Sequence, residues 1–218
     1  MVANLTMNPI LTTNAAGTFT VTFDGYMQGM AMDDPAMRNQ LTGGLLAESE
    51  TLPMFGGIPI TESIPAPVTA GTPPRTFTQD PALNTIITRA TSAADMTGIS
   101  VFNQNHAAIN TPQSQVPQAL SGMIVMLYRF GSLARIPLAA DPALIATLAG
   151  IIISPTALLW DVTNQRITSA AAGGAGIALP VSTKLIGFNA GNSMTVLFDP
   201  VTGYANWNRQ GDAVLLQI

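Results

Sequence analysis

Apolar and polar residues alternate over several short stretches of the chain, and a period of two is typical of β-strands. The alternation is clear in GTFTVTF at residues 17–23. Near the C-terminus, SMTVLFD at 193–199 and YANWNRQ at 204–210 flank the turn sequence PVTG and predict a β-hairpin, and DAVLLQI at 212–218 predicts a final strand. Further strands are expected in NTIITRA at the end of 76–90, in DMTGISVFNQ at 95–104, in SGMIVMLYRFG at 121–131, and in a hairpin over 157–170 that turns around Thr163–Gln165.

Two short segments carry the start and stop signals of helices. In MDDPAMRNQLTGG, Asp34 can cap a helix, proline fits the first helical position, and the pair Gly43–Gly44 can end the helix. These signals predict a helix over Pro35–Leu41. The segment DPALIATLAG at 141–150 repeats the Asp-Pro start and the Gly stop, and it predicts a second helix of one to three turns.

The pattern as a whole favours an all-β fold. Eight to ten short strands separated by Gly- and Pro-containing turns are typical of a sandwich or jelly roll, here with two short helices. Residues 53–75 hold six prolines with glycines between them, which is incompatible with the interior of a sheet or a long helix. We therefore expect a long Pro-rich arm there. This divides the chain into residues 1–75, with a strand, the short helix and the arm, and residues 76–218, with the sandwich or jelly roll.

The Pro-rich arm is the segment that we expect to contact a partner. Loops of this length in compact domains are usually functional or bind a partner, and an arm that adds a strand or a clamp to a neighbour is a common way to hold two subunits together. The helix that begins at Pro35 would anchor its base. The arm residues expected at the contact are Pro53, Met54, Phe55, Pro59, Pro65, Pro67, Pro73 and Pro74.

The low charge content also favours a protein that contacts a partner. Charged residues make up 9% of the chain, against about 25% in a typical soluble domain. Interface cores are depleted of charge, so this composition favours a subunit that is covered by neighbours. The alternative is a secreted or phage-type β protein, rich in Thr and Asn, without a special interface. The net charge of −4 and the absence of a basic run argue against direct nucleic-acid binding.

One stretch has nearly the length of a membrane span. Residues 142–160 contain no charged side chain, and about 20 apolar residues are needed to cross a bilayer as a helix. Gly150 and Pro155 interrupt this stretch, and Asp161 and Arg166 follow it in a strand-like pattern. We expect a buried helix followed by a strand, and no membrane partner. The N-terminus lacks the basic and long apolar regions of a signal peptide, so none is expected.

The motifs of common catalytic sites are missing from the sequence. The chain has no cysteine and no G-x-S-x-G motif, and His106, its single histidine, lies in the polar stretch NQNHAAIN with no acid nearby in sequence. GGAG at 173–176 lacks the spacing of a phosphate-binding loop and is typical of a turn or linker. We therefore expect neither an enzyme nor a bound cofactor.

The acidic residues Asp33, Asp34, Glu48 and Glu50 lie close together in sequence and allow two interpretations. Paired carboxylates can hold a metal ion or serve as an acid/base pair, as in a metal-dependent glycan hydrolase. However, the spacing is not that of a calcium loop, and helix capping explains Asp34. Glu48 and Glu50 alternate with Ser and Thr, as on an exposed strand edge. We expect structural roles for all four.

Two stretches resemble known proteins. GYMQGMAMDDPAMRNQLTGGLLAESETLPMFGGIPITE, residues 25–62, resembles the N-terminal region of structural proteins of tailed bacteriophages, and VLFDPVTGYANWNRQGDAVLLQI, residues 196–218, is similar to their closing β-hairpin. This resemblance implies a capsid cement, or head decoration, protein. Such proteins lie on the outer surface of the head, clamp neighbouring major capsid subunits, are β-rich and often jelly rolls, and form dimers or trimers at symmetry axes.

The sequence therefore predicts a non-enzymatic virion protein that cements the capsid. Its expected partners are the major capsid protein and itself, as a homodimer or homotrimer. The alternatives are another virion component, such as a minor tail or fibre-type protein, and the metal-dependent glycan hydrolase described above.

Overall fold

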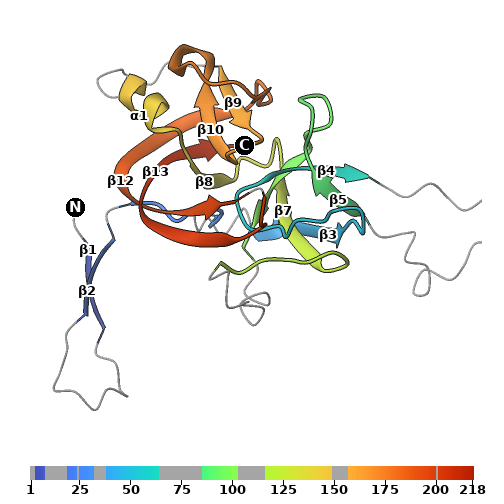
Figure 1. Cartoon of the computed structure of the whole chain (residues 1–218), viewed down its shortest axis with the longest axis horizontal. Helices are drawn as coiled ribbons and strands as arrows, with labels where there is room; N and C mark the ends of the chain where they lie inside the picture. The colour runs from blue at the N-terminus through green and yellow to red at the C-terminus, as the bar shows by residue number, and fades with distance from the viewer. Residues whose placement is uncertain are drawn as a thin grey trace, which may run out of the picture.

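Strands are by far the commonest regular element of the described chain in the computed structural model (Figure 1), which confirms the all-β class. The structure describes residues 3–7, 19–23, 25–31, 38–63, 85–102, 116–148, 157–199 and 201–218. The described strands form a small closed barrel, two three-stranded sheets and a two-stranded hairpin. The expected sandwich or jelly roll is therefore not confirmed.

The barrel contains five short strands in the order β3-β5-β4-β6-β7. Strand β3 pairs in parallel with β5, and the other pairs are antiparallel. β-branched and aliphatic side chains fill its interior, including those of Leu46, Ile60, Ile87, Ile99 and Leu127, which are at most 1% exposed. The strands are β3 (Thr42–Leu46), β4 (Pro59–Ser63), β5 (Ile86–Arg89), β6 (Gly98–Val101) and β7 (Ile124–Arg129).

A curved sheet in the order β12-β13-β8 lies beside the barrel (Figure 1). Strands β12 (Lys184–Phe198) and β13 (Ala205–Gln217) form the predicted C-terminal hairpin, and β13 also pairs with β8 (Arg135–Ala139). Three register irregularities interrupt the β12–β13 ladder, and such irregularities bend a strand and increase its twist. The final strand predicted over 212–218 is confirmed as far as Gln217, but it is continuous with the second strand of the hairpin, and the two together form β13.

A smaller unit, the side sheet, completes the described fold. Its strand order is β10-β9-β11, with β9 (Leu158–Asp161), β10 (Arg166–Ser169) and β11 (Ile177–Ala178). The antiparallel pair β9–β10 confirms the hairpin predicted around Thr163–Gln165. A short 3-10 helix, η4 (Ala170–Ala172), follows β10, with Ser169 as its N-cap and Gly173 as its C-cap. The GGAG stretch thus begins as a turn.

The second predicted helix is confirmed as α1 (Pro142–Leu148). The Asp141 carboxylate caps it by accepting a hydrogen bond from the backbone N–H of Ala143 at 2.9 Å. Its apolar face buries Leu144, Ile145 and Leu148. Within the described residues, no helix has both the length and the apolar character needed to cross a membrane. Residues 149–156 lie outside the described part of the chain.

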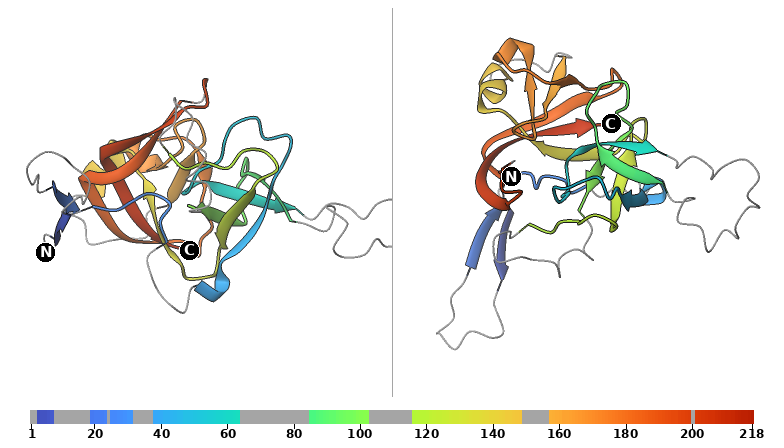
Figure 2. Two further views of the ribbon diagram at one scale, coloured as in Figure 1. Left: turned by 90° about the horizontal axis from the view of Figure 1, so that it is seen from below. Right: turned by 45° about the vertical axis from the view of Figure 1, so that its right-hand side comes forward.

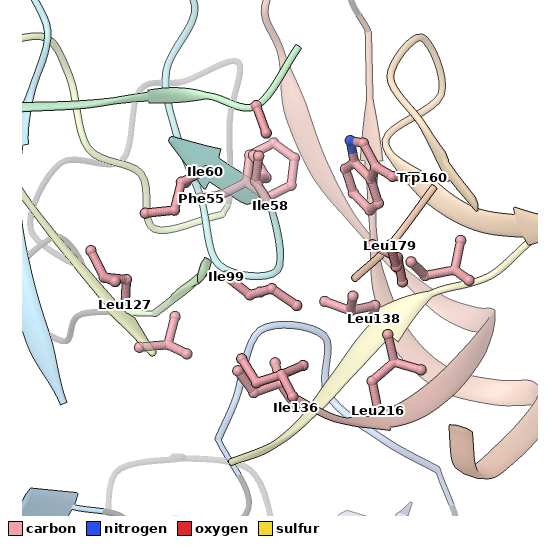
Figure 3. Close-up of a cluster of buried hydrophobic side chains, with 14 of the residues drawn as sticks. Phe55, Ile58, Ile60, Ile99, Leu127, Ile136, Leu138, Trp160, Leu179 and Leu216 are labelled. Atoms are coloured by element: carbon pink, nitrogen blue, oxygen red, sulfur yellow. The ribbon is translucent and has the colours of Figure 1, made fainter. Parts of the chain in front are cut away.

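One hydrophobic core runs through the barrel, the curved sheet and the side sheet (Figure 3). Ile58, which directly precedes β4, and Ile99 of β6 meet Ile136 and Leu138 of the curved sheet, and Trp160 and Leu179 extend the cluster toward the side sheet. Strands from both sides of residue 75 pair within the barrel, so the predicted boundary between residues 1–75 and 76–218 would cut through it.

The predicted helix over Pro35–Leu41 is corrected at its C-terminal end. Of this segment the structure describes residues 38–41, where η1 (Arg38–Gln40) forms a single 3-10 turn. Gly43–Gly44 do not stop a helix, because they lie inside β3, where β7 and β5 flank the strand. A Cβ on Gly44 would lie 2.6 Å from the carbonyl oxygen of Thr85, so glycine is needed here for close approach of two backbones.

The predicted arm is also corrected, over residues 53–63. Met54 exchanges two backbone hydrogen bonds with Ala119, and the side chains of Met54 and Phe55 are buried in the core. Pro59 begins β4, a strand position that tolerates a missing N–H. Apolar residues between the prolines, such as Ile58 and Ile60, are buried in the core, and their burial favours this segment as part of the barrel. The remaining arm prolines, Pro65, Pro67, Pro73 and Pro74, lie outside the described residues.

Two aspartates shape the turns of the predicted hairpins. At the β12–β13 turn, Asp199 accepts hydrogen bonds from the Thr202 hydroxyl (2.6 Å) and the Val201 N–H (2.9 Å), and these lower the pKa of Asp199. At the β9–β10 turn, partial burial acts to raise the pKa of Asp161. Hydrogen bonds from Asn164 and Thr163, with the charge of Arg166, outweigh burial and leave that pKa lowered.

We expect Thr202→Val to raise the pKa of Asp199 toward its ordinary value, because the hydroxyl is the main group that stabilises the ionised carboxylate. The folded-state pKa lies below the unfolded one, so this turn adds stability above the unfolded pKa and loses it as pH falls through the folded pKa. A carboxyl-carbon NMR titration measures the shift. Thr163→Val is the matched control, because Thr163 bonds Asp161 through its backbone N–H alone. If Thr163→Val shifted the pKa of Asp161 as much as Thr202→Val shifts the pKa of Asp199, the Thr202 hydroxyl would not be the cause of the lowered Asp199 pKa.

Candidate assembly site

The acidic residues of the described chain do not form a metal centre. No group of three or more His, Cys, Asp or Glu side chains in the described residues could hold a metal ion. Glu48 is exposed, whereas Glu50 is largely buried and forms an ion pair with Arg89, so the expectation of an exposed edge holds for Glu48 and is wrong for Glu50. Asp33, Asp34 and His106 lie outside the described residues.

Glu50 belongs to a network around Arg89 of strand β5. Its two carboxylate oxygens accept hydrogen bonds from the Arg89 backbone N–H (2.8 Å) and guanidinium (2.7 Å). The guanidinium also donates to the carbonyl oxygens of Leu52 and Pro53, and it lies 5.9 Å from the Phe198 ring centre. Burial lowers the pKa of Arg89, and the charge of Glu50 opposes that shift. The network joins β5 to the segment before β4, which is a structural role.

The N-terminal strands form a hairpin that stands away from the rest of the described chain (Figures 1 and 2). Strand β1 (Ala3–Met7) pairs antiparallel with β2 (Phe19–Phe23), and neither pairs with any other described strand. The strand over 17–23 was predicted from its alternation, but its partner β1 was not. A two-stranded hairpin is at best marginally stable alone in water, so this hairpin needs further contacts.

The register of this hairpin separates apolar from polar positions. Opposed pairs share a face, and successive residues alternate between faces. Three of the five pairs combine only apolar residues and therefore mark one face: Ala3 with Phe23, Leu5 with Val21, and Met7 with Phe19. The other two pairs, Asn4 with Thr22 and Thr6 with Thr20, mark a polar face. Residues 1–23 contain no Asp, Glu, Lys, Arg or His.

Residues 25–31, here called the strap, attach the chain that follows the hairpin to the body. Tyr26 and Gln28 form backbone hydrogen bonds with Met194 of β12 at 2.7 and 2.9 Å. Gly29 donates to the carbonyl oxygen of Pro137 in β8 and accepts from the N–H of Phe102. The strap therefore contacts both the curved sheet and the end of β6.

The side chain of Gln28 joins the two larger parts of the fold. It is fully buried, its Oε1 accepts from the Val196 N–H at 2.8 Å, and its Nε2 donates to the Gly56 carbonyl oxygen at 3.4 Å. Val196 belongs to the curved sheet, and Gly56 precedes β4 of the barrel. Gln28 therefore bonds the strap to both of these parts.

The hairpin and strap together have the properties of an assembly site. Three of its five register pairs join only apolar residues, neither of its strands pairs with another described strand, and the strap is hydrogen-bonded to β12 and β8. Such an element can bury its apolar face against another protein or extend another sheet by strand addition. The side chains of residues 1–23 include no acid or base that could transfer a proton near neutral pH.

No protein-family model matches the chain, and no curated protein or solved structure is significantly similar to it. The resemblance of residues 25–62 and 196–218 to structural proteins of tailed phages therefore stays a prediction.

Proposed function

We propose that this chain is a non-enzymatic structural protein of a tailed-phage virion. It cements the capsid by binding the outer surface of the major capsid protein lattice and by associating with itself as a homodimer or homotrimer. The observation that supports this proposal most strongly is the N-terminal hairpin, which pairs with no other described strand and carries six apolar residues at one set of paired positions.

The composition of the hairpin favours a protein partner. Without any ionisable side chain in residues 1–23, it offers nothing to neutralise phosphates or anionic headgroups. Burial of an apolar sheet face against another protein would lower its free energy by roughly 25 cal/mol for each Å² removed from water. The low charge of the whole chain fits a subunit whose surface is largely covered after assembly.

Two finer expectations belong to this proposal. The first is a second contact through the arm prolines Pro65, Pro67, Pro73 and Pro74, because Met54, Phe55 and Pro59 are buried within the chain itself. The second is the sandwich or jelly-roll topology common among cement proteins, which an experimental structure of the assembled protein would test.

We expect Val21→Asp to weaken self-association and binding to empty heads by about tenfold or more, because an apolar contact would strip water from an unpaired carboxylate. Val21 pairs with Leu5 at an apolar position of the hairpin. Sedimentation equilibrium measures the solution mass, and co-sedimentation with empty heads that lack this protein measures capsid binding.

The matched control is Thr20→Asp, which adds the same charge one residue away, at a position of the polar set. It should retain most of the binding. The proposal fails if the unmodified protein stays monomeric and never co-sediments with heads. The hairpin's role fails if both variants bind equally well. Electron microscopy of labelled particles separates a head position from the alternative of a minor tail or fibre-type protein.

A further inference from the structure

A pocket of about 320 Å³ lies between the curved sheet, the side sheet and the start of α1. Ligand pockets typically span about 300–1,000 Å³, so this one suits a small ligand. Its polar lining comes from three separate elements. The polar side chains in its wall are those of Asn164, Arg166, Thr195, Asn208, Gln210 and Asp212.

The sheet side of the pocket is a short polar ladder. Thr195 of β12 lies directly opposite Asn208 of β13, and Gln210 follows two residues later on the same strand. The side-chain carbonyl oxygen of Asn208 accepts the Gln210 backbone N–H at 3.0 Å, which leaves both N–H donors of its amide without a partner among the described residues. The Gln210 amide is likewise unpaired among the described residues. Each amide group offers donors and an acceptor side by side.

On the opposite wall, the charged side chain of Arg166 already has carboxylate partners. Arg166 bonds Asp141 at 2.8 Å and lies 4.0 Å from Asp161. Asn164 donates to Asp161 at 2.6 Å, and its own side-chain carbonyl oxygen has no partner among the described residues. On the sheet side, Asp212 of β13 accepts from the Gly191 N–H at 2.8 Å. The pocket wall and the ion-pair partners of Arg166 thus hold three carboxylates, those of Asp141, Asp161 and Asp212, against one guanidinium, and this excess of negative charge disfavours an anionic ligand.

We propose that this pocket binds an uncharged, hydroxyl-rich ligand, namely one or two sugar residues of a glycan. Neighbouring hydroxyl groups of a sugar are both donors and acceptors, and they match the free amide groups of Asn208 and Gln210 and the free carbonyl of Asn164. The remaining wall is apolar and can contact the C–H face of a sugar ring; Ala139, Ala140, Pro142, Val196, Leu197, Phe198 and Gly211 line it. This site is separate from the hairpin and does not depend on the proposed role in the virion.

The test is an NMR titration of the full chain with glucose, galactose, N-acetylglucosamine, maltose and lactose. We expect at least one of these sugars to shift the side-chain amide signals of Asn208 and Gln210. Asn208→Ala and Gln210→Ala should each weaken that binding roughly fivefold, the effect of losing about one neutral hydrogen bond. Asn206→Ala, an exposed position on the same strand outside the pocket, should leave it unchanged.

Glucose 6-phosphate distinguishes the uncharged class from anionic ligands. The proposal is overturned if no neutral sugar shifts these signals, if glucose 6-phosphate binds more tightly than glucose, or if a short peptide amide binds and the sugars do not. It is also overturned if the double variant N208A/Q210A binds as tightly as the unmodified chain while its thermal unfolding is unaltered.

Discussion

Replacing Arg89 with methionine is expected to reduce the free energy of unfolding by about 3–5 kcal/mol, the usual effect of removing one partner of a buried ion pair. The side chains of Arg89 and Glu50 are only 14% and 17% exposed. Methionine keeps much of the apolar stem, but it leaves the Glu50 carboxylate without its cation and removes the donor to the carbonyls of Leu52 and Pro53. Urea unfolding followed by tryptophan fluorescence measures the loss.

Arg129→Met on the same barrel is the matched control. Arg129 also forms an ion pair, with Glu62 at 2.8 Å; the arginine side chain is 57% exposed and the glutamate side chain 10%. The hydrogen bond to Glu62 raises the pKa of Arg129, and solvent screens the exposed guanidinium, so its loss should cost less than the loss of Arg89, on the order of 1 kcal/mol. The double variant R89M/E50Q should recover part of the stability lost in Arg89→Met, because no unpaired charge remains. If Arg89→Met and Arg129→Met lowered the free energy of unfolding equally, burial of the arginine would not determine how much stability its ion pair contributes.

Gln28→Met is expected to lower the free energy of unfolding by about 2–3 kcal/mol, because each buried polar group left without a partner costs about 1–3 kcal/mol. The short bond to the Val196 N–H should account for most of this, and the 3.4 Å bond to the Gly56 carbonyl for less. Methionine is nearly isosteric, so the change removes the bonds and keeps the packing. Thermal unfolding and the hydrogen-exchange rate of the Val196 amide measure the global and local effects.

Gln40→Met tests whether the loss of the buried hydrogen bonds of Gln28 causes the lower stability of Gln28→Met. Gln40 is exposed at the end of η1, where the same substitution should change stability by less than about 0.5 kcal/mol. If the Val196 amide exchanged at the same rate in Gln28→Met and the unmodified chain, the strap would not hold β12 through this side chain. Weaker self-association in Gln28→Met would link the strap to the hairpin that it anchors.

Elements built from neighbouring residues were predictable. The C-terminal hairpin and the β9–β10 hairpin follow from period-two alternation around short turns, and α1 follows from the Asp-Pro start before an apolar run. In each, residues within about a dozen positions determine the conformation through turn chemistry and capping. The candidate site was predicted only in part: the alternation marked strand β2, whereas β1 and the strap were not anticipated.

The errors share one cause, which is pairing between distant segments. Prolines and glycines indicated an arm over residues 53–63 and a helix stop at Gly43–Gly44, yet both segments contribute barrel strands because β5, β6 and β7 supply partners for their backbones. The local pattern placed Glu50 on an exposed edge, whereas Arg89, 39 positions away, covers it. A local pattern carries no information about which distant strand will satisfy a backbone group.

The all-β class, the two hairpins, α1 and the low charge that suggests a covered subunit could all be inferred from the order of the residues. Other features emerge only from the folded chain: five strands close into a barrel, Gln28 bonds a residue 168 positions away, and polar residues from three elements line one pocket. The difference lies in the range of the interactions. Alternation and capping act over a few residues, whereas barrel closure, buried polar contacts and pockets depend on which surfaces meet once the chain has folded.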